Sequence, residues 1–160
     1  MLQTTRAYRG MVTSPHHLAS EAGLRVLREG GTAIEASVAI AATLTVVYPH
    51  MNALGGDNFW LVSDPSKNVT AIDACGGAAR AAGIGFYKSK GLDAIPSRGP
   101  LAALTVGGAV SGLERVLRIS ATSGGKLPLG RLFEDAIYYA ENGVPAVSYT
   151  HLTLPTKRIV

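Results

Sequence analysis

The chain has 160 residues, about the size of one domain, so it can bury a single hydrophobic core. Hydrophobic residues make up 47% and charged residues 16%, a charged share below the usual value of about 25%, and this composition excludes intrinsic disorder. The net charge of +4 comes from basic residues scattered singly along the chain. That pattern argues against a nucleic-acid partner, because tracking phosphates needs clustered cations.

The sequence predicts a cytoplasmic protein. Its longest apolar stretch, Ala33 to Val47, contains Glu35 and is shorter than the roughly 20 apolar residues that span a bilayer, so no membrane partner is expected. The first residues, Met1 to Arg6, lack the apolar core of a secretory signal. The single cysteine, Cys75, cannot form an internal disulfide, which fits a reducing compartment.

The first predicted helix runs from His16 to Glu29. Ser14 is expected to cap it, and Pro15 suits its first turn. Apolar residues recur inside it at helical spacing: Leu18, Ala22 and Val26. The pair Gly30 and Gly31 should end the helix.

A second helix is predicted over residues 33–47. Thr32 followed three residues later by Glu35 is a capping-box pattern, and the residues after it are apolar on every face until Pro49. A helix that is apolar all round is normally buried, so this one should form the core of the domain.

A β-hairpin is predicted next, with strands over Phe59–Val62 and Val69–Ile72 around the turn residues 64–68. The loop Asn52–Asn58 leads into it and contains Gly55 and Gly56. Paired glycines allow a close backbone approach, so the loop is either a tight structural corner or a nest of backbone N–H groups that holds an anion.

The second half of the chain reads as loops followed by two helices. An Ala/Gly-rich stretch at 76–85 precedes a short amphipathic piece near 86–90 and a turn at 97–100. One helix should start after Gly107 and Gly108 with an apolar face formed by Val110, Leu113, Val116 and Leu117. The last predicted helix has apolar residues at successive three- and four-residue steps and should end at Asn142–Gly143: Leu129, Leu132, Phe133, Ala136, Ile137 and Ala140. This order predicts an α/β layered fold, in which helices cover a mostly antiparallel sheet.

Motifs that carry chemistry are sparse. The fragments that begin like a dinucleotide fingerprint, a P-loop or a nucleophile elbow all break the required spacing. His16, His17 and His50 have no acidic or cysteine partners at ligand spacing, so they are expected to be polar residues at helix ends, not metal ligands. Cys75 has no cationic neighbour to activate a thiolate and is expected to be a small packing residue.

Several segments, in order, resemble the start of the large subunit of the gamma-glutamyltranspeptidase family. They are Gly10–Leu24, Leu27–Ala36, Pro49–His50 and Gly55–Phe59, with Leu127–Leu129 and Ala140–Pro145 near the end. Residues 1–147 are therefore expected to form part of a large-subunit domain. Residues 148–160 show neither helical nor alternating periodicity, so they are expected to be a non-native tail.

The resemblance implies an N-terminal-nucleophile hydrolase with an αββα sandwich, of which only the N-terminal part is present. Such a precursor cuts itself in two, and the new N-terminal threonine of the small subunit becomes the nucleophile with its own α-amine as base. That threonine would lie beyond this chain. The expected partners are the small subunit and a small-molecule amide, with no cofactor or metal, and a homo-oligomer of such heterodimers is left open.

Within the family, three segments look most similar to the branch that hydrolyses oxamate: Tyr48–Asn52, Asp73–Gly76 and Ile95–Val106. Members that transfer glutamyl groups bind the substrate carboxylate with an arginine where this chain has Cys75. The alternatives are a gamma-glutamyltransferase or glutathione hydrolase, and a non-catalytic binding domain. A carboxylate substrate still needs a cation, for which Arg98 is preferred over Arg80 because Arg98 lies in a proline-flanked turn. Gly55, Gly56 and Asp57 are expected near the site.

Overall fold

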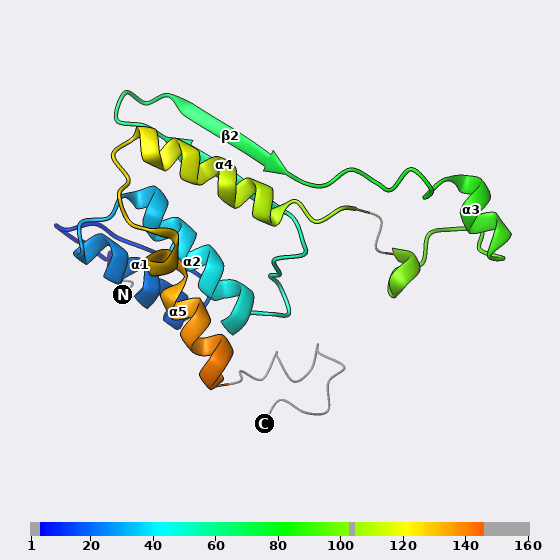
Figure 1. The fold of residues 1–160 in the computed structure, drawn as a ribbon, viewed down its shortest axis with the longest axis horizontal. Helices are drawn as coiled ribbons and strands as arrows, with labels where there is room; N and C mark the ends of the chain where they lie inside the picture. Colours follow the sequence, from blue (N-terminus) through cyan, green and yellow to red (C-terminus); the bar gives the residue numbers. More distant parts are fainter. Residues whose placement is uncertain (1–3, 103–104, 146–160) are drawn as a thin grey trace. The chain divides into compact units, whose positions relative to one another are not determined.

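The computed structural model describes residues 4–102 and 105–145. The chain divides into two compact units, one formed by residues 1–53 with 113–160 and the other by residues 54–112. We call these the helical unit and the hairpin unit and describe each by itself. Figure 1 labels helices α1 to α5 and strand β2.

The helical unit begins with α1 (His17–Arg28), whose start differs from the prediction. The cap is His16, whose ring nitrogen accepts a hydrogen bond from the Leu18 N–H, and not Ser14. The Ser14 hydroxyl instead donates to the His16 carbonyl and forms a hydrogen bond with the Ser20 hydroxyl. Ser14 therefore stabilises the first turn from a position outside the helix. The predicted stop is confirmed, since Gly30 follows the helix with a φ of +88°.

Helix α2 (Ala33–Val47) forms as predicted. The Thr32 hydroxyl accepts from the Glu35 N–H while the Glu35 carboxylate accepts from the Thr32 N–H, which completes the capping box. Small side chains dominate its buried positions: Ala36, Val38, Ala39, Ala42, Thr43 and Val47. Because α2 packs against both α1 and α5, it is the centre of this unit (Figure 1).

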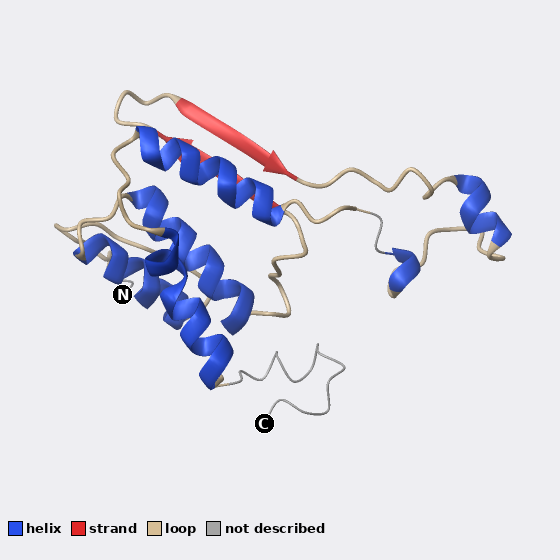
Figure 2. Cartoon of the chain, viewed as in Figure 1, coloured by secondary structure: helices blue, strands red, loops and turns tan. Residues whose placement is uncertain are grey.

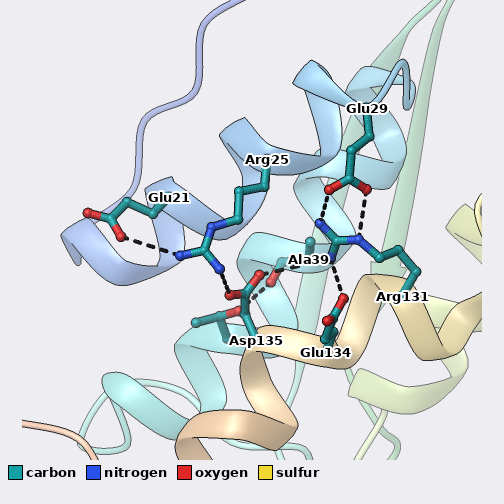
Figure 3. A network of polar contacts seen from close by, with 8 residues as sticks. Glu21, Arg25, Glu29, Ala39, Arg131, Glu134 and Asp135 are labelled. Atoms are coloured by element: carbon teal, nitrogen blue, oxygen red, sulfur yellow. Dashed lines mark hydrogen bonds and ion pairs between the residues drawn. The ribbon is translucent and has the colours of Figure 1, made fainter.

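Helix α5 (Leu129–Asn142) buries Leu132 and Ala136. The helix forms as predicted, but Leu129 and Ile137 of its apolar series remain exposed, with exposed fractions of 56% and 48%. Charged side chains join this helix to α1, as Figure 3 shows, through an Arg25–Asp135 pair and an Arg131–Glu29 pair. The Arg25–Asp135 contact measures 2.6 Å between nitrogen and oxygen.

Helix α4 (Ala109–Thr122) starts in the hairpin unit and continues in the helical unit. Leu113, Val116 and Ser120 are buried, whereas Val110, at the start of the predicted apolar face, is exposed. Periodicity identifies an apolar stripe without saying how much of the stripe is covered.

The hairpin unit contains the predicted β-hairpin, drawn in red in Figure 2. Strands β1 (Asn58–Ser63) and β2 (Val69–Ala74) pair antiparallel, with Trp60 opposite Ile72. In the turn, the Asp64 carboxylate accepts from the backbone and side chain of Asn68. Phe59, Leu61 and Val69 remain exposed on these strands.

From β2 the chain runs to α3 (Ile84–Ser89) and a 3-10 turn at Pro100–Ala102 before it returns to α4. An isolated bridge between Ala78 and Thr105 joins the outgoing and returning segments. The buried Tyr87 of α3 donates its hydroxyl to the Leu101 carbonyl over 3.0 Å, which holds α3 to the returning segment.

The described residues therefore form a mixed α/β structure with one two-stranded sheet. This confirms the mixed class, while the four-layer sandwich stays a prediction about a longer chain. The predicted tail at 148–160 lies outside the described residues. Within the part of the chain that is described, no helix is long and apolar enough to cross a bilayer.

Candidate functional site

Three glycine-containing segments meet in the hairpin unit, and we call them together the glycine junction: Gly55–Asp57, Cys75–Gly77 and Val106–Gly108. The Gly56 carbonyl accepts from the N–H groups of Gly108 and Ala109 over 3.0 and 2.9 Å. The Gly77 carbonyl accepts from the Val106 N–H over 3.1 Å. The junction therefore fixes the loop before β1 and the chain after β2 to the start of α4.

The backbones approach so closely that side chains are excluded. A Cβ at Gly76 would lie 1.5 Å from the Val106 carbonyl oxygen, and one at Gly108 would lie 2.1 Å from the Ala74 carbonyl oxygen. Only glycine tolerates such an approach. These contacts support the structural-corner alternative for the loop at 52–58.

Asp57 is the charged residue of the junction. Its carboxylate accepts from the Gly76 N–H over 3.3 Å, and the Cys75 thiol donates to its other oxygen over 3.5 Å. The Cys75 N–H donates to the Asp73 carboxylate over 2.9 Å. The structure thus brings the predicted Asp57 together with Cys75.

Cys75 itself is exposed, so its predicted packing role is wrong. The hydrogen bond to Asp57, partial desolvation and the negative charges of Asp57 and Asp73 all raise the pKa of the thiol. A raised pKa keeps the thiol protonated and weakly nucleophilic. The structure therefore gives Cys75 the properties of a neutral thiol between two carboxylates.

Asp57→Asn is expected to speed alkylation of Cys75 severalfold at pH 8. The variant keeps the size of the side chain but removes the charge that raises the pKa of the thiol, so more thiolate is present at a given pH. The measurement is the rate of iodoacetamide labelling of Cys75, followed by peptide mass spectrometry. Asp64→Asn, in the hairpin turn, is the matched control and should leave the rate unchanged. An unchanged rate in Asp57→Asn would contradict the charge effect.

The two candidate arginines lie away from these contacts along the chain. Arg80 occupies a turn after the bridge at Ala78, and Arg98 lies in the bend before Gly99, and both are exposed. Neither guanidinium is hydrogen-bonded or paired to another described residue. A hollow beside α3 is lined by Ala82, Ile84, Tyr87, Lys88, Leu92, Asp93, Ala94 and Ile95. Neither arginine lines this hollow. The described contacts also do not join Arg80 or Arg98 to Asp57, or the two arginines to each other.

The histidines lie at helix ends, as predicted: His16 caps α1, His17 is its first residue, and His50 follows α2. Over residues 4–102 and 105–145, no group of three or more histidine, cysteine or acidic side chains could hold a metal ion. Sequence reasoning missed the return of residues 106–108 to the loop at 55–57. The signals in the sequence were the glycine pairs at 76–77 and 107–108, which follow the pair at 55–56 along the chain.

The comparison with known proteins matches residues 19–158 to the family model described as Gamma-glutamyltranspeptidase. The chain is 55% identical over 90% of its length to an oxamate amidohydrolase proenzyme of Klebsiella pneumoniae, and 45% identical over 84% to a glutathione hydrolase-like proenzyme of Bacillus subtilis. It spans 27% and 25% of those proteins, about a quarter of their length.

Among solved structures, the Helicobacter pylori gamma-glutamyltranspeptidase matches with a TM-score of 0.77 and 34% identity, over 89% of this chain and 40% of that one. The Pseudomonas nitroreducens enzyme in complex with L-DON matches with a TM-score of 0.80 and 28% identity, over 92% of this chain and 43% of that one. The described fold is thus the corresponding part of those structures. The resemblance seen in the sequence is confirmed, and the chain belongs to the gamma-glutamyltranspeptidase family.

Proposed function

We propose that this chain is the N-terminal part of a self-processing amidohydrolase that acts on a small carboxylate-bearing amide such as oxamate. The observation that carries the proposal is the 55% identity with the Klebsiella protein named oxamate amidohydrolase proenzyme. The chain covers 27% of that protein, so most of the active site is expected outside it.

In this proposal the chain contributes scaffold and substrate contacts, and a later segment contributes the nucleophile. The new N-terminal threonine would attack the amide carbonyl through its hydroxyl oxygen, with its α-amine accepting the proton. Ammonia would leave, and water would then hydrolyse the acyl-enzyme. The complete enzyme would be an αββα sandwich shared with the small subunit, located in the cytoplasm.

The second candidate is glutathione hydrolysis or gamma-glutamyl transfer. It is favoured by the 45% identity with the protein named glutathione hydrolase-like proenzyme. The surroundings of Cys75 favour the first candidate, because a neutral thiol between Asp57 and Asp73 cannot hold the α-carboxylate of a glutamyl group. A third candidate, a non-catalytic binding domain, would need no processing.

The test is steady-state kinetics of the full-length processed protein with oxamate, followed as ammonia release, and with gamma-glutamyl-p-nitroanilide. We expect the larger kcat/KM with oxamate. A larger value with the glutamyl substrate would replace the first candidate with the second. A protein that hydrolyses neither substrate and is never cleaved would support the binding domain.

Arg98→Lys is expected to raise KM for oxamate by about tenfold, because it keeps the charge but loses the two-pronged contact of a guanidinium with a carboxylate. Self-cleavage should remain intact, since the substitution is in an exposed bend. Progress curves of ammonia release give KM, and gel electrophoresis gives the extent of cleavage. Arg80→Lys is the matched control. Unchanged kinetics in Arg98→Ala would remove Arg98 from the site, and a rise in KM only in Arg80→Lys would assign the contact to Arg80.

A further inference from the structure

His16 lies where the start of α1 meets the end of α2. It is a buried residue, with an exposed fraction of 6%, and its ring stacks on His17 at a centroid distance of 4.8 Å. On the other side its ring lies 6.5 Å from that of Tyr48, the residue that ends α2. His16 therefore connects two helices through its ring as well as capping one of them.

The cap depends on an unprotonated nitrogen. The His16 Nδ1 accepts the Leu18 N–H over 3.3 Å, so in the folded state the proton of the neutral ring is on Nε2. Protonation would put a second N–H on the ring, facing the Leu18 N–H. Donor would then face donor, and the hydrogen bond would be lost.

Two further effects disfavour a charged His16. A cation at a helix N-terminus opposes the helix dipole, which favours negative charge there. The ring is also buried and next to a second histidine, and both burial and the His17 charge lower the pKa of His16. Of the titratable groups, His17 on α1 and Tyr48 at the end of α2 face the ring, and His50 in turn contacts the Tyr48 ring.

We propose that His16 is a proton-sensitive helix cap: protonation of its Nδ1 releases the first turn of α1. In its neutral form the imidazole holds the Leu18 N–H and packs against Tyr48. In its charged form it can no longer accept the Leu18 N–H, and the first turn of α1 opens. Tyr48 is the residue at which the chain leaves α2 towards the loop before β1, and His16 is in ring contact with it.

The expected direction follows from proton linkage. Because the folded state binds the proton more weakly than the open state, acid favours opening. The effect starts as the pH falls below about 6.5, the ordinary pKa of histidine, and saturates below the lowered pKa of His16. Between those limits, protection of the first-turn amides should fall by about tenfold per pH unit for one proton.

The test is hydrogen exchange with mass spectrometry on the full-length protein from pH 8 to pH 5, corrected for intrinsic exchange rates. Peptides that span residues 14–24 should lose protection in acid, while those from α5 should not. His16→Asn keeps a capping oxygen that does not titrate, and its protection should be independent of pH. His16→Asp, a cap ionised over the whole range, is the second variant if the first does not fold.

His17→Asn is the matched control. It should keep the acid-dependent loss with its midpoint at higher pH, since the neighbouring positive charge is gone. Constant protection of residues 14–24 in the wild type would overturn the proposal. So would the same loss in His16→Asn and His16→Asp as in the wild type, or a loss that only His17→Asn abolishes.

Discussion

Glu35→Ala is expected to lower the free energy of unfolding by about 3 kcal/mol, because it leaves several backbone donors without an acceptor. Glu35 has an exposed fraction of only 2%. One oxygen accepts from the N–H groups of Lys126 and Leu127, each over 2.7 Å, and the other accepts from the Thr32 N–H over 2.7 Å. The same side chain thus caps α2 and holds residues 126–127, which precede α5, by hydrogen bonds.

The stabilising effect of Glu35 should also depend on pH. Burial raises the pKa of this carboxyl, but the hydrogen bonds from Thr32, Leu127 and Lys126 outweigh it, so the pKa is lowered overall. A carboxyl with a lowered pKa stabilises the folded state fully above its unfolded pKa of about 4.3, and this stabilisation is lost as the pH falls through the folded value. Glu35→Gln should not show that part of the acid loss.

Guanidinium unfolding of wild type and variants at pH 7 and pH 3.5 measures both effects. The matched control is Glu114→Ala, which removes an exposed ion pair with Arg118 on α4 and should cost less than about 1 kcal/mol. Equal decreases in the free energy of unfolding for Glu35→Ala and Glu114→Ala at pH 7 would show that the hydrogen bonds of Glu35 to residues 126–127 do not stabilise the fold.

Gly76→Ala is expected to cost about 3 kcal/mol and to disrupt the glycine junction. The added Cβ would overlap the Val106 carbonyl oxygen at 1.5 Å, and because that oxygen belongs to the backbone, the chain itself must shift. The shift would break the hydrogen bonds of Gly76 to Asp57 and of Val106 to Gly77.

The adjacent Gly77→Ala is the matched control, because a Cβ there meets nothing within 4 Å. The measurement is the apparent unfolding midpoint of each variant, together with limited proteolysis of the hairpin unit. Gly76→Ala should lower the midpoint and be cleaved faster, while Gly77→Ala should behave as the wild type. Similar behaviour of the two variants would mean that the segments of the junction do not approach as described.

Local signals in the sequence predicted the elements well. The capping box of Thr32 and Glu35 and the turn residues at 64–68 act over a few residues, so α2 and the hairpin form where expected. The start of α1 was predicted at Ser14, because serine is the commoner cap. His16 takes that place since its ring also packs against His17 and Tyr48, and that packing is not a local signal.

Helical periodicity does not show how much of an apolar face is buried. Val110 and Ile137 fit helical periodicity but are 60% and 48% exposed. A helix pattern marks which residues could be buried, and a partner must be present to bury them.

The candidate site depends on contacts between distant residues, which one sequence does not reveal. The Gly108 N–H donates to the Gly56 carbonyl, and the Cys75 thiol donates to the Asp57 carboxylate. The sequence shows these residues individually but not that they pair. The local reading of Cys75 as a packing residue failed because its acidic neighbour lies in another segment. Arg98 and Arg80 stay predictions, because their proposed ligand would be held together with residues outside this chain.

The proposed function requires this chain to be the N-terminal part of a proenzyme that processes itself. The most direct measurement is the intact mass and N-terminal sequence of every polypeptide in the purified full-length protein. We predict two polypeptides, the larger one containing residues 1–147 of this chain and the smaller one beginning with threonine. A single uncleaved polypeptide that nevertheless hydrolyses oxamate, or a reading frame that stops near residue 150, would contradict the claim.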